Sequence, residues 1–179
     1  MINTTLVTVG TTKYDELLKE INKEEFFNSL VKIGCKNLII QYGNSILPED
    51  FPKNKFTLKN GTILNITTYK FKFDNIKEHG FKEDMIKSDL IISHAGSGTI
   101  LDSLELKKKI IVVPNETLMD NHQSELADAM SKKGVIISSP LSELVNTLNN
   151  LENFEFKPFL KENNNTFVNI LDDIMGFEI

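Results

Sequence analysis

Hydrophobic residues along this chain follow two spacings, one typical of buried strands and one typical of helices. Continuous aliphatic runs predict strands at residues 5–9, 37–41, 89–93, 109–113 and 135–138. Apolar positions three or four residues apart predict helices at residues 14–33, 81–88, 97–106, 120–133 and 140–151. Strands and helices therefore alternate, which indicates right-handed βαβ crossovers. We expect an α/β, Rossmann-like fold with a mostly parallel sheet and helices on both faces.

Some segments do not fit this simple alternation of strands and helices. The first helical stretch is expected to divide at residues 22–23. Residues 43–60 contain glycine and prolines and predict a long irregular loop, and residues 62–73 predict a strand or a hairpin. For the last helix, we expect Ser139 to be the N-cap and Pro140 the first helical residue.

The chain is expected to form one domain, residues 1–152, followed by a C-terminal extension, residues 153–179. Hydrophobic residues make up 40% of the 179 positions and charged residues 25%, which is sufficient for a stable core. The extension carries several phenylalanines and aliphatic residues. It is therefore too apolar for a free tail.

The charge balance narrows the possible functions. Asp and Glu outnumber the basic residues 25 to 20, and the net charge is −5. Proteins that grip nucleic acid over a broad surface neutralise its phosphates, so this balance argues against a nucleic-acid partner. Every basic residue is a lysine. Without arginine, a bound phosphate must be held by backbone amides, a helix N-terminus or lysine.

The single cysteine, Cys35, excludes an internal disulfide and a multi-cysteine zinc site, and it is expected in or near the core. We find no cluster with metal-ligand spacing and expect neither a metal nor a cofactor. No apolar run reaches the roughly 18–20 residues that a membrane span needs. The N-terminus lacks the basic region of a signal peptide, so a cytoplasmic protein is expected.

The first candidate site is the Gly-Thr-Thr turn that follows the first strand. Gly10 permits an unusual backbone conformation or the close approach of a ligand. The hydroxyls of Thr11 and Thr12 can donate to that ligand. An ordinary strand-to-helix turn, with Thr11 or Thr12 as the N-cap, explains the same residues, and a single glycine favours this simpler interpretation.

The second candidate site lies in residues 93–102, SHAGSGTILD, where a buried strand leads directly into a helix. Its glycines let the backbone approach an anion, and its hydroxyls lie beside the first helical amides. Those amides together carry about half a positive charge, which suits a diphosphate. The residues expected to bind are Gly96, Ser97, Gly98 and Thr99.

Two further residues of this segment have side chains suited to a nucleotide. Asp102 lies one turn into the helix, where its carboxylate can accept from ribose hydroxyls. His94 lies at the carboxyl end of the strand, where open α/β sheets bind ligands. The alternative is that His94 is a structural histidine and that the neighbouring glycines only accommodate packing.

The third candidate site is the loop and helix start at residues 114–127, PNETLMDNHQSELA. Polar groups at a helix start also serve as caps, which is the alternative here. The second and third loops leave the same edge of the sheet and together predict a nucleotide-sugar pocket. No hydrolytic triad or Gly-x-Ser-x-Gly elbow is present. The residues expected to bind from this loop are Asn115, Glu116, Asn121, His122 and Gln123.

The chain resembles a known family in three segments, VTVGTTKYDELL, SDLIISHAGSGTILDSLE and KKIIVVPNETLMDNHQSELA. The family comprises the soluble catalytic subunits of the two-subunit UDP-N-acetylglucosamine (UDP-GlcNAc) transferases of dolichol-linked oligosaccharide synthesis. The resemblance covers about residues 4–137 and is most specific at residues 89–127.

The resemblance implies the C-terminal, donor-binding half of a GT-B glycosyltransferase that inverts the sugar linkage without a metal. A membrane-anchored partner subunit would recruit the chain to the cytosolic face of the endoplasmic reticulum. Together, the two subunits would add the second GlcNAc, in β1,4 linkage, to GlcNAc-diphosphate-dolichol. The C-terminal segment would dock the partner.

The resemblance also implies roles for single residues. Residues 97–99 would contact uracil and diphosphate, and Asp102 would hold the ribose at a position where glutamate is more usual. The GlcNAc hydroxyls would face Asn121, His122 and Gln123. The catalytic base would come from the partner, or else be His94 in this chain.

Two other functions remain open at this point. One is a subunit of a bacterial-type two-component polysaccharide transferase that uses another UDP-sugar, although those proteins usually have THGG where this chain has SHAG. The other is a non-catalytic nucleotide-sugar-binding protein on the same fold.

Overall fold

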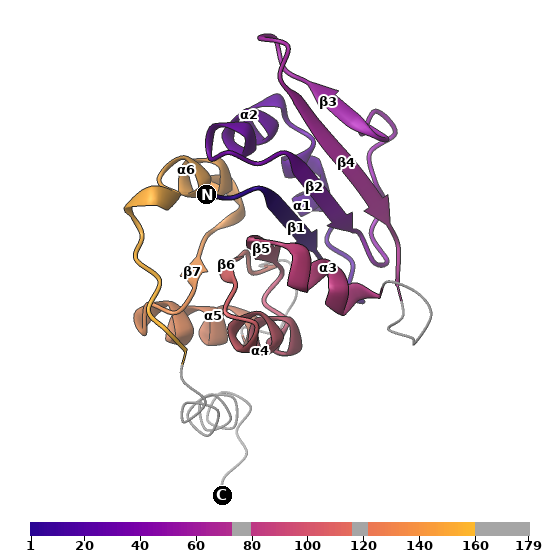
Figure 1. Ribbon diagram of the computed structural model, residues 1–179. Helices are drawn as coiled ribbons and strands as arrows, with labels where there is room; N and C mark the ends of the chain where they lie inside the picture. The colour runs from indigo at the N-terminus through magenta and orange to yellow at the C-terminus, as the bar shows by residue number, and fades with distance from the viewer. Residues whose placement is uncertain (73–79, 116–121, 160–179) are drawn as a thin grey trace, which may run out of the picture.

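A twisted sheet lies at the centre of the computed structural model, which describes residues 1–72, 80–115 and 122–159, apart from the side chains at 122 and 123. Within these residues seven strands form one sheet in the order β3-β4-β2-β1-β5-β6-β7 (Figure 1). β3 pairs with β4 antiparallel, and every other pairing is parallel. The strands are β1 Thr4–Thr8, β2 Asn37–Gln41, β3 Lys55–Thr57, β4 Ile63–Tyr69, β5 Leu90–Ser93, β6 Lys109–Val112 and β7 Ile137–Ser138.

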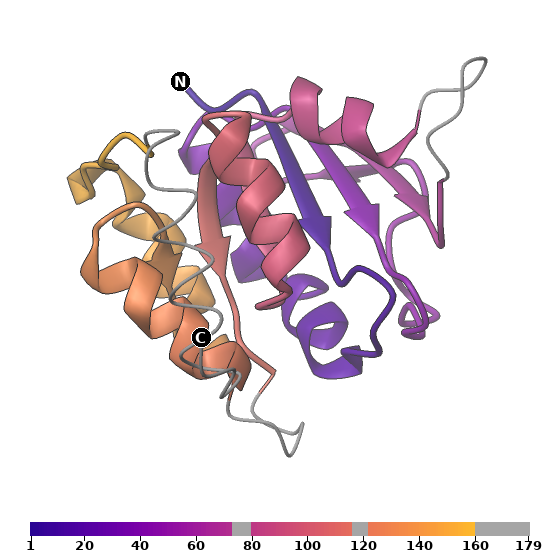
Figure 2. The same ribbon diagram turned by 90° about the horizontal axis from the view of Figure 1, so that it is seen from below.

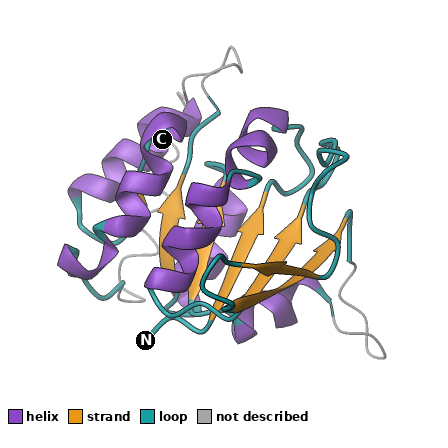
Figure 3. Ribbon diagram, turned by 90° about the horizontal axis from the view of Figure 1, so that it is seen from above, coloured by secondary structure: helices purple, strands orange, loops and turns teal. Residues whose placement is uncertain are grey.

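Helices cover both faces of the sheet (Figures 2 and 3). Apolar residues of α1, α2 and α6 form one core cluster with the strands, and those of α3, α4 and α5 form a second cluster. Successive side chains of a strand point to opposite faces of the sheet. In β1, Leu6 therefore belongs to the second cluster and Val7 to the first. The predicted α/β fold is therefore confirmed. The helices are α1 Asp15–Ile21, α2 Glu24–Lys32, α3 Phe81–Lys87, α4 Ser97–Glu105, α5 His122–Lys132 and α6 Leu144–Asn149.

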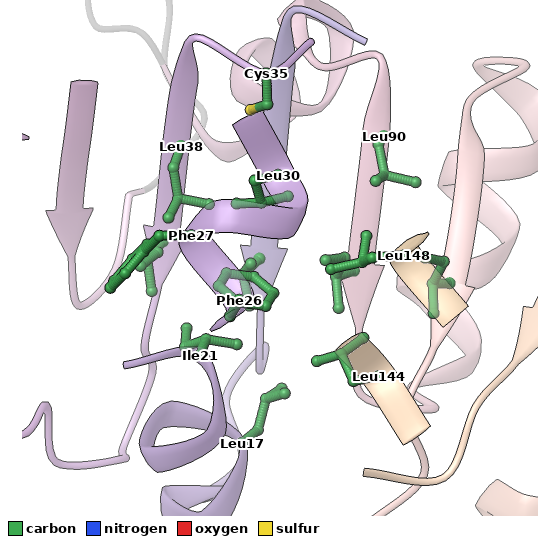
Figure 4. Packing of buried hydrophobic residues seen from close by; sticks show 14 of the residues in the cluster. Leu17, Ile21, Phe26, Phe27, Leu30, Cys35, Leu38, Leu90, Leu144 and Leu148 are labelled. Carbon is green, nitrogen blue, oxygen red and sulfur yellow. The ribbon is translucent and has the colours of Figure 1, made fainter. Parts of the chain in front are cut away.

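Aromatic packing anchors α2 in the first cluster, and Figure 4 shows Phe26 and Phe27 close to Leu30, Leu38 and Ile21. The Phe27 ring stacks on Phe56 with the ring centroids 4.4 Å apart. It also meets the edge of Phe51 at 6.0 Å. These contacts hold the segment after β2 against the sheet. Cys35 is buried nearby, as expected.

The prediction of one irregular loop at residues 43–60 is wrong in its last third. β3 forms there and pairs with β4, with Phe56 opposite Leu64. Too few residues are involved for an alternating pattern to stand out in the sequence. The Phe56 contact with Phe27, a residue far away in the chain, stabilises the strand.

The last helix also differs from its prediction. Instead of one helix over residues 140–151, a 3₁₀ turn at Leu141–Glu143 precedes α6, and a second 3₁₀ turn, Leu151–Asn153, follows it. Ser139 is not an N-cap. Ser139 is buried. Its hydroxyl forms a hydrogen bond with the Thr147 hydroxyl at 2.8 Å and donates to the Pro140 carbonyl at 3.1 Å.

The start of the predicted extension packs on the domain. Phe156 contacts the first core cluster and Phe159 contacts the second. The Lys157 N–H donates to the Gly134 carbonyl at 2.9 Å. Among the described residues, no helix has the length and apolar character that crossing a membrane requires.

We expect Phe27→Ala to lower the free energy of unfolding by about 3–5 kcal/mol, because the cavity removes contacts with Phe56 and Phe51. Urea denaturation followed by circular dichroism measures this loss. Ile46→Ala is the matched control, since Ile46 is 70% exposed. Equal midpoints for the two variants would contradict this account of the core.

Candidate functional site

The first candidate site forms a tight turn between β1 and α1. Gly10 has φ of +60°, which favours glycine. Its N–H donates to the Thr8 hydroxyl oxygen at 3.1 Å and to the Gln41 side-chain oxygen at 2.9 Å. The Thr12 N–H and hydroxyl both donate to the Val9 carbonyl, at 3.2 and 2.7 Å. These donors are therefore occupied within the turn.

The alternative in which a threonine caps the next helix is wrong. α1 begins at Asp15, and its N-cap position is Tyr14, without a side-chain cap. The threonines lie before the helix, where Thr11 is exposed and the Thr11 carbonyl accepts from the Asn44 side chain at 2.8 Å. A direct contact of Gly10, Thr11 or Thr12 with a ligand remains a prediction.

The imidazole of His94 lies in a space that two glycines leave open. A Cβ on Gly96 would lie 2.6 Å from His94 Nε2, and a Cβ on Gly10 would lie 2.8 Å from His94 Cε1. Both distances are shorter than side chains tolerate. The structure thus brings together two of the sequence-predicted loops around one ring, and neither glycine can be replaced without moving it.

His94 is 6% exposed, and its Nδ1 is buried without a hydrogen-bond partner among the described residues. Its backbone N–H donates to the Thr8 carbonyl at 3.2 Å, which links β5 to β1. Burial disfavours the charged imidazolium and lowers the pKa of His94 below its ordinary value of 6.5. The ring is therefore neutral at neutral pH. The two glycines accommodate the ring, and no described residue bonds to Nδ1, so the alternative of a structural histidine stays open.

The second candidate site is the N-terminus of α4. The first helical hydrogen bond runs from the Ile100 N–H to the Gly96 carbonyl at 3.1 Å, so the amides of residues 97–99 precede it. Gly96 is the N-cap and has no side chain to cap them. α1, α2 and α3 each carry two acidic residues in the first turn, but α4 carries none. The positive end of the α4 dipole is therefore left uncompensated and suits an anion.

Asp102 lies on the next turn of α4, where it is exposed. Thr99 is three residues earlier, so the two side chains are neighbours on the helix surface. The carboxylate has no hydrogen bond or ion pair with another described residue. It is thus available to a ligand bound across the first turn.

The third candidate site is tied to the first by two contacts. The Tyr14 hydroxyl donates to the Pro114 carbonyl at 2.8 Å, and the Asn115 side chain donates to the Lys13 carbonyl at 3.3 Å. Asn115 is buried. α5 begins at His122, so His122 and Gln123 are its first two residues. Their side chains lie outside the described part of the chain, and so do the whole residues Glu116 and Asn121.

Sequence reasoning missed Gln41 and Tyr14, two buried residues that connect the loops. The available signal for Gln41 was a polar residue ending the aliphatic run Leu38-Ile39-Ile40. Nothing in the sequence indicated the Tyr14 contact, which joins residues 100 positions apart. Among the described residues, no group of three or more His, Cys, Asp and Glu side chains is placed to hold a metal ion.

Known proteins resemble this chain in sequence and in fold. The family model described as "Glycosyltransferase family 28 C-terminal domain" matches residues 4–174. The chain belongs to this family. Family 28 membership agrees with the fold, in which the polar loops meet at the carboxyl edge of a parallel sheet.

Two curated family 28 relatives are named UDP-N-acetylglucosamine transferase subunit ALG13. The human protein is 40% identical over 129 residues, covering 72% of this chain and 10% of its own length. The chain therefore spans about a tenth of that relative. The Saccharomyces cerevisiae protein is 32% identical over 188 residues, covering 92% of each.

Solved structures agree with this assignment. An NMR solution structure of ALG13 aligns with a TM-score of 0.66 and 28% identity over 94% of each chain. The crystal structure of the glycosyltransferase SnogD from Streptomyces nogalater aligns with a TM-score of 0.54 and 15% identity, over 97% of this chain and 39% of its own. The second likeness concerns the fold alone. The family 28 chain thus has the fold of the C-terminal half of a GT-B glycosyltransferase.

We expect Gly96→Ala to destabilise the protein by about 1–3 kcal/mol, because the new Cβ meets the buried His94 ring. Gly98→Ala is the matched control on the same helix, since a Cβ there meets nothing within 4 Å. It should leave stability unchanged or raise it by up to about 1 kcal/mol, since alanine favours helix. Urea denaturation measures both, and the same loss in the two variants would refute the steric role of Gly96.

The lowered pKa of His94 predicts a pH-dependent stability. The unfolded chain binds a proton on this side chain at a higher pH than the folded protein does, so the free energy of unfolding should fall as the pH drops through about 6.5. His94→Gln lacks this group. Denaturant titrations at pH 7.5 and 5.5 should show a smaller difference in the variant than in wild type. An unchanged difference would mean that the ring is not held neutral.

Proposed function

We propose that this chain is the donor-binding catalytic subunit of an N-acetylglucosaminyltransferase that takes UDP-GlcNAc. The proposed reaction adds the second GlcNAc, in β1,4 linkage, to GlcNAc-diphosphate-dolichol during synthesis of the N-glycan precursor. Family 28 membership supports the reaction type, and the relatives named UDP-N-acetylglucosamine transferase subunit support the donor. The dolichol acceptor follows from the sequence resemblance.

The observation that carries the proposal is the start of α4. It presents amides without a side-chain cap and no acidic residue in the first turn, beside a buried imidazole whose Nδ1 has no hydrogen-bond partner in the described part of the chain. In a chain without arginine, such amides and the lysines are the groups that can bind a phosphate. The diphosphate of the donor fits them through the amides of residues 97–99 and the hydroxyls of Ser97 and Thr99.

The same groups would assist the chemistry. Negative charge builds up on UDP as the bond to the sugar breaks, and fixed amide dipoles that already point at the diphosphate stabilise this charge without reorganising. His94 would take part in this stabilisation as a neutral imidazole, because burial lowers its pKa below the ordinary value of 6.5. In this mechanism UDP leaves without a metal ion, and the configuration of the sugar inverts.

The catalytic base is proposed to come from the partner subunit. A general base must reach the acceptor hydroxyl within hydrogen-bond distance, and the His94 ring is enclosed between Gly10 and Gly96 with only 6% of the residue exposed. This enclosure favours a role for His94 on the donor side over its predicted role as base. The acceptor would then approach from the other half of the cleft.

The remaining predicted contacts belong to the sugar and the nucleoside. Asp102 is proposed to accept hydrogen bonds from the ribose, supported by its exposed, unengaged carboxylate one turn beyond the diphosphate site. The GlcNAc is proposed to meet the loop between β6 and α5 through Asn115, Glu116 and residues 121–123. The Tyr14 and Asn115 contacts, which join that loop to the first turn, support a shared pocket.

The partner is proposed to be a membrane-anchored subunit on the cytosolic face of the endoplasmic reticulum. The relatives are called subunits, and the chain matches the C-terminal domain of glycosyltransferase family 28. The C-terminal extension, residues 153–179, is proposed to dock this partner, and its residues 160–179 lie outside the described part of the chain.

Calorimetric titration of UDP, UDP-GlcNAc and UDP-glucose tests the proposal. We expect wild type to bind UDP and to prefer the GlcNAc donor over UDP-glucose. Asp102→Ala should weaken the binding free energy by about 1–3 kcal/mol, because the ribose hydroxyls lose a charged acceptor. Glu105→Ala, which removes the same charge from an exposed residue at the far end of α4, should leave it unchanged.

Two results would contradict the proposal. Equal losses in the two variants would indicate a general charge effect and no ribose contact. If wild type bound no UDP compound either alone or with the partner subunit present, the donor-binding function itself would be wrong.

A further inference from the structure

Gln41 occupies the end of β2 and is 4% exposed. Its side-chain oxygen accepts hydrogen bonds from the Thr8 hydroxyl at 2.5 Å and the Gly10 N–H at 2.9 Å. Its side-chain nitrogen donates to the Gly10 carbonyl at 2.7 Å and the Lys70 carbonyl at 2.9 Å. A primary amide has two acceptor positions and two donors, so the full capacity of this group is used inside the protein.

Gly10 is held from both sides by this one amide, which bonds to its N–H and to its carbonyl. At φ of +60° the glycine turns its Cα toward the His94 ring, where a Cβ would lie 2.8 Å from Cε1. A small shift of Gly10 in either direction would therefore press on the ring or leave a gap beside it.

The ring also meets the start of α4. Gly96, the N-cap of that helix, is the second residue whose Cβ would collide with the imidazole, at 2.6 Å from Nε2. A continuous series of contacts thus runs from Gln41 through Gly10 and His94 to the first amides of α4. No member of the series before His94 has a free side chain to offer a ligand.

We propose that Gln41 is a positioning residue for the diphosphate site: by fixing Gly10 it seats the His94 ring beneath the N-terminus of α4. The inference rests on the proposed function for the identity of the ligand. Gln41 itself touches no ligand, since it is buried and its hydrogen bonds are all internal. Its effect on binding is transmitted through the position of His94.

The same amide also joins a third loop to this arrangement. Lys70, which follows β4, gives its carbonyl to the Gln41 side chain and also accepts from the Gly43 N–H at 3.2 Å. Gly43 lies so close to the first turn that a Cβ on it would be 2.4 Å from the Gly10 carbonyl oxygen. The turn is therefore enclosed beside Gly43, where both Gln41 and Asn44 bond to it.

The test uses Gln41→Glu and Gln41→Met in the full chain. The glutamate variant keeps the shape and the acceptor for the Gly10 N–H but loses both donors, while the methionine variant loses all four hydrogen bonds at similar length. The probe is UDP, measured by calorimetry. We expect about tenfold weaker binding or more in both variants, because a displaced site loses alignment with its ligand.

A second readout separates positioning from simple loss of stability. The His94 ring resonances and their titration, followed by NMR without ligand, should change in both Gln41 variants. Leu38→Ala is the matched control: it removes a buried side chain from the same strand, away from the Gly10 turn, and should lower stability while leaving the His94 signals and UDP affinity as in wild type. All measurements are made where each variant is fully folded.

The two proposals fail in different ways. If the Gln41 variants bind UDP like wild type and leave the His94 resonances unchanged, the positioning role is overturned and the donor site stands. If wild type binds no UDP, the proposed function is overturned. The His94 resonances then still decide whether Gln41 seats the ring, because they require no ligand.

Discussion

The buried imidazole of His94 constrains how the loops after β1 and β5 approach each other at the carboxyl edge of the sheet. It fills a space between the turn after β1 and the start of α4, and it does so because the facing residues, Gly10 and Gly96, have no Cβ. Each loop is held by its own strand, and the strands are adjacent and parallel. The ring therefore transmits the position of one loop to the other. Burial lowers the pKa of the ring, and no described residue forms a hydrogen bond with its Nδ1.

The second constraint is the chemistry available for binding an anion. With twenty lysines and no arginine, the chain lacks the planar fork that many phosphate sites use. The described lysines that form ion pairs do so with carboxylates away from α4, such as Lys72 with Asp84 at 2.8 Å. The first turn of α4 has neither an acidic residue nor a side-chain cap. Backbone amides consequently carry the electrostatic role, and their direction is set by the helix itself.

Most of the fold could be predicted because the hydrophobic patterns that indicate its strands and helices lie within single segments of the chain. The buried runs that became β1, β2, β5 and β6 are continuous, and the helical spacing of α1 to α5 is regular. The errors have a common cause. β3 depends on the contact of Phe56 with Phe27, and the last helix starts late, after a 3₁₀ turn, with the buried Ser139 hydroxyl bonded to Thr147. Side-chain contacts decided both, one between residues 29 positions apart and one between residues eight positions apart, and the hydrophobic spacing records neither.

The sequence by itself determined the class of fold, the three loops that carry polar residues and the absence of arginine, which leaves backbone amides, a helix N-terminus or lysine for any phosphate. These properties follow from residue order and residue type alone. Only the tertiary structure decided that one histidine lies between two glycines from different loops, and that a glutamine from a third strand bonds to one of them. The physical reason is that close approach and hydrogen-bond pairing depend on distances in space. Those distances exist only after the strands have assembled into the sheet.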